Sequence, residues 1–168
     1  LSSVCREKGV PLLVDNAHGA HLAFFEQMHP LALGADACCD SLHKTLPALT
    51  GTALLHLRDK TQKDRARKLM AVFASTSPSY LMMLSADMLA DNWRELSGKI
   101  KKLANDVFAL RKAAEKRGVW AVVGAVDPLR ISLLFMQGAR KETEALLAKL
   151  FIEPEMTTDR HIVLLLSP

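Results

Sequence analysis

Four side chains of this sequence have the chemistry needed to hold an aldehyde cofactor. Lys44 lies in the stretch DSLHKTLPALTGTALLH (residues 40–56), close to Ser41 and His43, and Asp15 ends an apolar run 29 residues earlier. Lysine forms a stable imine with an aldehyde, and an aspartate facing a pyridine nitrogen keeps that nitrogen protonated. Serine and histidine donate hydrogen bonds to phosphate. An aldehyde, a pyridine nitrogen and a phosphate together describe pyridoxal 5′-phosphate (PLP).

The elements that would position these residues are typical of a layered α/β fold. Apolar runs at residues 10–15, 34–41 and 52–57 are expected to form strands, the first of them buried on both faces. Helical patterns follow these runs, which predicts a mostly parallel or mixed sheet covered by helices. Chemistry gathers at the carboxyl ends of strands in such sheets. We therefore expect Asp15 and the Ser41–Lys44 group to share one crevice.

The helices that follow carry recognisable end signals. Asp59 is expected to cap a helix over residues 60–73. Ser77 as N-cap and Pro78 as first helical residue are expected to begin a long helix whose apolar pattern continues to Gly118. The first part of its apolar face consists of Leu81, Leu84, Met88 and Leu96. After residue 118 the pattern changes to a small β/α unit, with strands expected at 119–124, 129–136 and 161–166 and a helix at 141–151, so we place a domain boundary there.

Composition narrows the class of protein. With 168 residues, 49% hydrophobic and 24% charged, the chain is globular and long enough for one domain or slightly more. Its net charge of +4 is modest and its basic runs are interleaved with acids, which favours solvated helix faces over nucleic-acid binding. No signal peptide or membrane-spanning run is apparent. Three cysteines, Cys5, Cys38 and Cys39, are typical of free thiols in a reducing cytoplasm.

A metal site is not expected from the histidine pattern. His18 and His21 stand three residues apart, but two histidines do not close a zinc site and no acid or cysteine cluster at ligand spacing completes one.

Four ordered motifs resemble the Orn/Lys/Arg decarboxylase family of fold-type-I PLP enzymes. They are VDNAHGAH (14–21), DSLHKTLPALTGTALLH (40–56), STSPSYLMMLSAD (75–87) and the tail IEPEMTTDRHIVLLLSP (152–168). The likeness covers essentially the whole chain but only the middle of such an enzyme, so we expect a piece of a longer protein. It implies that residues 1–118 are the C-terminal part of the PLP-binding large domain and residues 119–168 the start of a smaller C-terminal domain.

The resemblance also implies a role for each matching residue. Lys44 would carry the cofactor as an internal aldimine, and Asp15 would pair with the pyridinium nitrogen. Ala17 would pack against the cofactor ring, while Ser41 and His43 would hold its phosphate.

Three further residues are placed near the cofactor less directly. His18 follows the alanine of the first motif, which implies a position close to the cofactor. Ser75 or Thr76 would approach the phosphate of a neighbouring subunit, because members of the family build their sites at a dimer interface. A homodimer or higher homo-oligomer is therefore expected.

The activity implied is decarboxylation of lysine, arginine or ornithine, with diamines or agmatine as products. Two other readings stay open. The chain could be a non-catalytic fragment or a degenerate paralogue that keeps the core without binding PLP productively. It could also belong to another fold-type-I enzyme, such as an aminotransferase, which would share Asp15 and Lys44.

Overall fold

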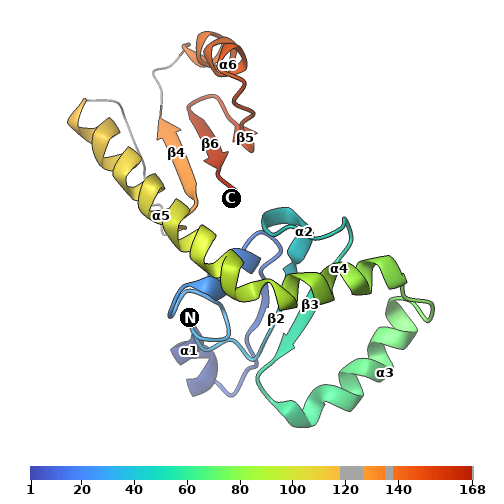
Figure 1. The fold of residues 1–168 in the computed structure, drawn as a ribbon. Helices are drawn as coiled ribbons and strands as arrows, with labels where there is room; N and C mark the ends of the chain where they lie inside the picture. The colour runs from blue at the N-terminus through green and yellow to red at the C-terminus, as the bar shows by residue number, and fades with distance from the viewer. Residues whose placement is uncertain (118–126, 135–137, 168) are drawn as a thin grey trace. The chain divides into compact units, whose positions relative to one another are not determined.

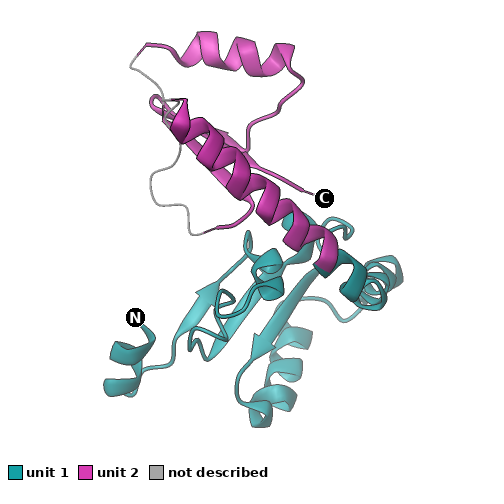
Figure 2. Cartoon of the chain, turned by 60° about the vertical axis from the view of Figure 1, so that its left-hand side comes forward, with its two compact units in different colours: residues 1–97 teal, residues 98–168 magenta. Residues whose placement is uncertain are grey.

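The structure is a computed structural model, and it describes residues 1–117, 127–134 and 138–167. The chain forms two compact units, residues 1–97 and residues 98–168, here called unit 1 and unit 2 (Figure 2). The division between them falls inside helix α5 (Trp93–Lys116). The domain boundary expected at residue 118 and the strand expected at 119–124 lie outside the described residues, so both stay predictions.

Unit 1 is built on a small mixed sheet with order β1-β2-β3 (Figure 1). In chain order its elements are α1 (Ser2–Glu7), β1 (Leu13–Asp15), η1 (Ala20–Phe24), β2 (Ala37–Ser41), α2 (Leu42–Thr45), β3 (Ala53–Leu57), η2 (Lys60–Gln62), α3 (Lys63–Phe73), α4 (Tyr80–Asp91) and the first turn of α5. Strand β1 is parallel to β2, and β2 is antiparallel to β3. The three predicted strands and the mixed sheet are confirmed.

Strand β1 corrects one expectation about burial. The sequence indicated a strand covered on both faces, but Leu13 is 71% exposed. The reason is that Leu13 lies on the same face of the sheet as Asp15 and Cys39, and this face is exposed in the described residues. An apolar run therefore predicted the strand correctly and its surroundings wrongly.

The two faces of this sheet differ in how deeply their side chains are buried. Cys38 and Asp40 of β2 are buried, whereas Cys39 between them is exposed and Ser41 is half-buried. Side chains alternate along a strand, and Asp15 pairs with Cys39 in the β1–β2 register. Asp15 therefore belongs to the open face, opposite the buried Asp40.

The helices of unit 1 begin close to the predicted positions. Asp59 caps η2, the short turn leading into α3, by accepting a 2.8 Å hydrogen bond from the Thr61 amide. Hydrogen bonds from Thr61 lower the pKa of the Asp59 carboxyl. Helix α4 begins two residues later than expected: Ser79 is its N-cap because the Ser79 backbone is still extended, with ψ 118°.

The expected long helix is divided in two. Asn92, with φ −91° and ψ 7°, separates α4 from α5, and its side chain donates to the Met88 carbonyl at 2.8 Å. The predicted apolar face is exposed along α4, at 67% for Leu81 and 55% for Leu84, whereas Leu96 in α5 is buried. Among the described residues α5 extends to Lys116.

Unit 2 has a three-stranded antiparallel sheet of order β4-β6-β5 and one further helix. Its elements after α5 are β4 (Arg130–Leu134), α6 (Arg140–Lys149), β5 (Met156–Thr157) and β6 (His161–Leu165). The side chains of Ile131 and Ile162 form part of its core. The expected strands around 129–136 and 161–166 and the helix between them are confirmed for the residues described.

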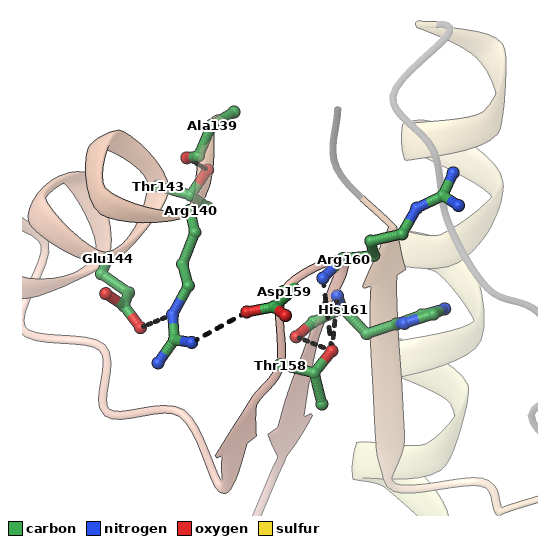
Figure 3. A network of polar contacts seen from close by, with 8 residues as sticks. All are labelled: Ala139, Arg140, Thr143, Glu144, Thr158, Asp159, Arg160 and His161. Carbon is green, nitrogen blue, oxygen red and sulfur yellow. Dashed lines mark hydrogen bonds and ion pairs between the residues drawn. The ribbon is translucent and has the colours of Figure 1, made fainter. Parts of the chain in front are cut away.

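Polar contacts fix the turn between β5 and β6 (Figure 3). The Thr158 hydroxyl accepts a 2.9 Å hydrogen bond from the His161 amide, while the Thr158 amide donates to the His161 carbonyl at 2.8 Å. Arg140, near the start of α6, contacts Glu144 at 3.0 Å and Asp159 at 3.4 Å. These exposed ion pairs contribute little stability, so the backbone pairing at Thr158 defines the turn.

Candidate cofactor site

Two segments that leave the sheet at the same edge carry the predicted site. β1 ends at Asp15, and β2 ends at Ser41, which begins the short helix α2 containing Lys44. Because β1 and β2 are parallel, their carboxyl ends lie side by side. The amide of Ala17 donates to Asp15 Oδ1 at 3.0 Å, which closes a tight turn after β1.

The most direct contact between these segments joins Lys44 and His18. The Lys44 Nζ lies 3.1 Å from His18 Nε2, and both residues are exposed. An ammonium group donates and has no acceptor, so His18 Nε2 accepts this hydrogen bond when Lys44 is charged. The structure thus brings together two residues that stand 26 positions apart in the sequence.

His43 is held by the turn that precedes β3. Its Nδ1 lies 3.3 Å from the Thr52 carbonyl oxygen and 3.3 Å from the Gly51 amide nitrogen. These contacts engage one ring nitrogen and leave Nε2 as the nitrogen for a ligand. Gly51 has φ +92°, and a Cβ there would lie 2.9 Å from the Met82 methyl carbon, so this turn requires glycine.

Ser75 and Thr76 lie in the loop between α3 and α4. The Ser75 hydroxyl accepts a 3.1 Å hydrogen bond from the Ser77 amide. Figure 1 shows this loop at the far end of the α3–α4 hairpin, away from α2. The structure therefore does not bring Ser75 or Thr76 to Lys44 within one chain, and their role across a dimer interface stays a prediction.

The buried face of the sheet carries a polar cluster that the motifs did not indicate. The Asp40 carboxylate accepts a 2.7 Å hydrogen bond from the Asn16 amide on Oδ1, and its Oδ2 lies 3.0 Å from Nε2 of both His29 and His56. Burial alone raises the pKa of Asp40, but the polar contacts with His56, Asn16 and His29 outweigh it and lower this pKa to about 2. Asp40 is therefore an anion within the core.

Sequence reasoning missed this cluster because its members share no spacing rule. His29 and His56 stand 11 and 16 residues from Asp40, on opposite sides of it in the chain. The one usable signal was an acid in the otherwise apolar strand ACCDS at the position whose side chain points inward. An inward-facing carboxylate requires partners, and that requirement could have prompted a search for them.

The two adjacent cysteines of β2 lie on opposite faces of the sheet, Cys38 on the buried face and Cys39 on the exposed one. Burial, followed by the charge of Asp40, raises the pKa of Cys38 to about 11. Burial and the neighbouring carboxylates of Asp15 and Asp40 also raise the pKa of Cys39, although its side chain is exposed. Neither thiol has the lowered pKa of a reactive nucleophile.

Solved structures with the same arrangement define the fold class. The constitutive lysine decarboxylase of E. coli has a TM-score of 0.71 at 19% identity, over 94% of this chain and 30% of that one. The Francisella novicida lysine decarboxylase LdcF has a TM-score of 0.70 at 15% identity, over 93% of this chain and 29% of that one. These likenesses confirm the predicted fold-type-I α/β class of fold.

The chain belongs to the Orn/Lys/Arg decarboxylase family, whose major-domain model matches residues 2–137. Arginine decarboxylase of Bacillus subtilis is 38% identical over 103 residues, which are 57% of this chain and 21% of that protein. The uncharacterised YaaO protein of the same organism is 29% identical over 94% of this chain and 36% of its own length. The chain thus spans roughly a fifth to a third of the curated relatives that it matches.

Proposed function

We propose that the protein containing this chain decarboxylates a basic amino acid, lysine, arginine or ornithine, with PLP as its cofactor. The 3.1 Å contact between Lys44 and His18, at the edge of the sheet where Asp15 ends β1, carries this proposal. Family membership supports the decarboxylase class, and the chemistry of the side chains supports the cofactor.

The described residues fit PLP at this edge. Lys44 and Asp15 are both exposed, so a planar ring could reach them without displacing core side chains. Asp15 accepts on Oδ1 within its own turn, and Oδ2 is the carboxylate oxygen that would face a protonated ring nitrogen. Ala17 offers a small side chain beside that turn. Ser41 and the Nε2 of His43 provide donors for a phosphate.

When bound, PLP supplies a protonated ring that accepts the electron pair left by a departing carboxyl group. Lys44 would hold the cofactor's aldehyde through its amine, and for this its ammonium must first lose a proton. His18 Nε2, at 3.1 Å, is placed to accept that proton and to return it later. Asp15 would hold the ring nitrogen protonated, and Ala17 would pack against one face of the ring.

A direct test is cofactor attachment. Purified chain mixed with PLP should give visible absorption, and borohydride reduction followed by peptide mapping should find the label on Lys44. Lys44→Ala should lose both signals, while Lys60→Ala, which removes another unit 1 lysine, should keep them. Label on another lysine would refute the assignment, and absence of any label would favour a non-catalytic fragment. Release of carbon dioxide from lysine, arginine and ornithine would then identify the substrate.

We also propose that two copies of the protein assemble, with Ser75 and Thr76 of one copy approaching the cofactor phosphate of the other. Helix α3 has no buried residue, and Phe73 and Tyr80, which flank the Ser75–Thr76 loop, are 82% and 85% exposed. Apolar surface of this kind usually marks a contact with another protein surface.

Charge placed at this surface should separate the copies. Phe73→Lys should weaken self-association at least about tenfold in sedimentation experiments, since it removes apolar contact and adds repulsion across a symmetric interface. Lys63→Arg at the start of α3 keeps the charge and serves as control. Unchanged association would refute this interface.

The cellular setting completes the proposal. The three cysteines are free thiols, which supports a cytoplasmic protein. Among the described residues, no helix is both long and apolar enough to cross a membrane. We also propose that residues 1–118 belong to the large domain and that a smaller C-terminal domain begins at residue 119.

A further inference from the structure

We propose that His29, Asp40 and His56 bind a divalent transition-metal ion of the zinc type. One ligand atom from each residue lies within 4.8 Å of the other two. The three come from separate segments: His29 from the loop after η1, Asp40 from β2 and His56 from β3. Imidazole nitrogens and a carboxylate oxygen are a typical ligand set for zinc.

The distances suit an ion. Nε2 of His29 and Nε2 of His56 each lie 3.0 Å from Asp40 Oδ2. In a tetrahedral site with bonds of about 2.0–2.1 Å, neighbouring ligand atoms are about 3.3 Å apart. Each imidazole nitrogen would need to move only a few tenths of an ångström away from Asp40 Oδ2. The two imidazole nitrogens, which lie within 4.8 Å of each other, would need to adopt the same spacing, and a water molecule could occupy the fourth position.

Neighbouring residues orient the Asp40 carboxylate and shield Asp40 and His29 from solvent. Asn16 donates to Asp40 Oδ1 at 2.7 Å, which orients the carboxylate and leaves Oδ2 directed at the imidazoles. The Asp40 side chain is 3% exposed and that of His29 is 12% exposed. Nε2 of His56 is buried and close to Oδ2, yet it makes no well-aligned hydrogen bond with it. An ion at the shared centre would satisfy this nitrogen.

The competing arrangement is a hydrogen-bonded cluster without an ion. His29 Nε2 can donate to Asp40, and the Leu31 amide approaches His29 Nδ1 at 3.4 Å, which suits the tautomer protonated on Nε2. Metal binding at Nε2 requires the single N–H proton of the neutral ring to stand on Nδ1 instead, and the long Leu31 contact is then given up. Direct detection of a bound ion therefore distinguishes a metal site from a cluster held by hydrogen bonds alone.

The inference is independent of decarboxylation. The cluster lies on the buried face of the sheet, whereas Asp15 belongs to the open face. An ion here would join β2, β3 and the loop after η1, and would steady the strand that leads into Ser41 and Lys44. Its expected role is structural.

Metal binding is measured on the wild-type chain after chelator treatment and dialysis. Titration with Co²⁺ should reach one ion per chain with visible absorption bands of a four-coordinate site, and Zn²⁺ should displace the cobalt. Asp40→Asn and His29→Gln should each raise the Kd at least about 100-fold, because each removes a direct ligand. His161→Gln, which removes a unit 2 histidine, should leave the Kd unchanged.

X-ray absorption of the zinc-loaded wild-type chain provides a second measurement that needs no variant. Two imidazoles and oxygen ligands at about 2.0–2.1 Å are expected. Less than half an ion per chain, or a spectrum without two imidazoles, would overturn the proposal in favour of the proton network. Binding that persists unchanged in both folded ligand variants would overturn it too. Loss of cofactor labelling at Lys44 would not bear on it.

Discussion

The two faces of the β1–β2–β3 sheet differ in burial and in how far their polar groups are paired within the chain. On one face, Asp40 and Cys38 are buried, and the polar groups of Asp40 are matched by partners within the same chain. On the other, Asp15 and Cys39 are exposed, and so is Lys44 in the helix that follows β2. Asp15 contacts its own turn and Lys44 contacts His18. The first face is completed by this chain, whereas the second presents the side chains of the proposed cofactor site. Because side chains alternate along β2, the residues of the buried cluster and those near the proposed cofactor site lie on different faces of the sheet.

The largest expected difference between the faces is in the free energy of unfolding. Asp40→Ala should cost about 2–4 kcal/mol, because it leaves His29 and Asn16 without their buried acceptor. Asp15→Ala should cost about 1 kcal/mol or less, since the carboxylate is exposed and its loss frees one turn contact. Urea unfolding in the presence of a chelator measures both. Equal costs would contradict the contrast between the faces.

Thiol chemistry should show the next largest difference. Cys39 is exposed, whereas Cys38 is 2% exposed and must await local opening before a reagent can reach it. Reaction with a thiol reagent under native conditions should be at least about 100-fold faster at Cys39. Cys39→Ser should remove the fast reaction and Cys38→Ser should retain it, with Cys5→Ser present in every sample to simplify the kinetics. A fast reaction in Cys39→Ser would show that the buried face opens readily.

The open face was the more predictable one. Lys44, His43 and Ser41 occur in one contiguous string, and Asp15 ends an apolar run, so the roles proposed for them could be assigned from local pattern and from family resemblance. The strands of unit 1 were likewise placed from apolar runs, because each strand is a local property of the sequence.

What could not be predicted depends on contacts between distant segments. Asp40 meets Asn16, His29 and His56 only after the sheet and the loop after η1 have formed, and no spacing rule connects them. The break at Asn92 is a second case, since apolar residues at helical spacing occur on both sides of it and one polar residue does not by itself end a helix. The exposure of Leu13 is a third, because burial depends on what covers that face of the sheet and not on the strand itself.

The smallest expected effect concerns Leu13, on the same face as Asp15. At 71% exposure, Leu13→Ser should change the free energy of unfolding by no more than about 0.5 kcal/mol in dilute solution. Leu42→Ala, at a residue that is 3% exposed, is the matched comparison and should cost about 2–5 kcal/mol. If another protein surface covers Leu13, binding contributes to its apparent stability, and the cost of Leu13→Ser must then increase with protein concentration. Urea unfolding of both variants over a hundredfold range of concentration separates the two cases. A constant small cost means that this face stays open in solution, and a rising one means that association of copies buries it.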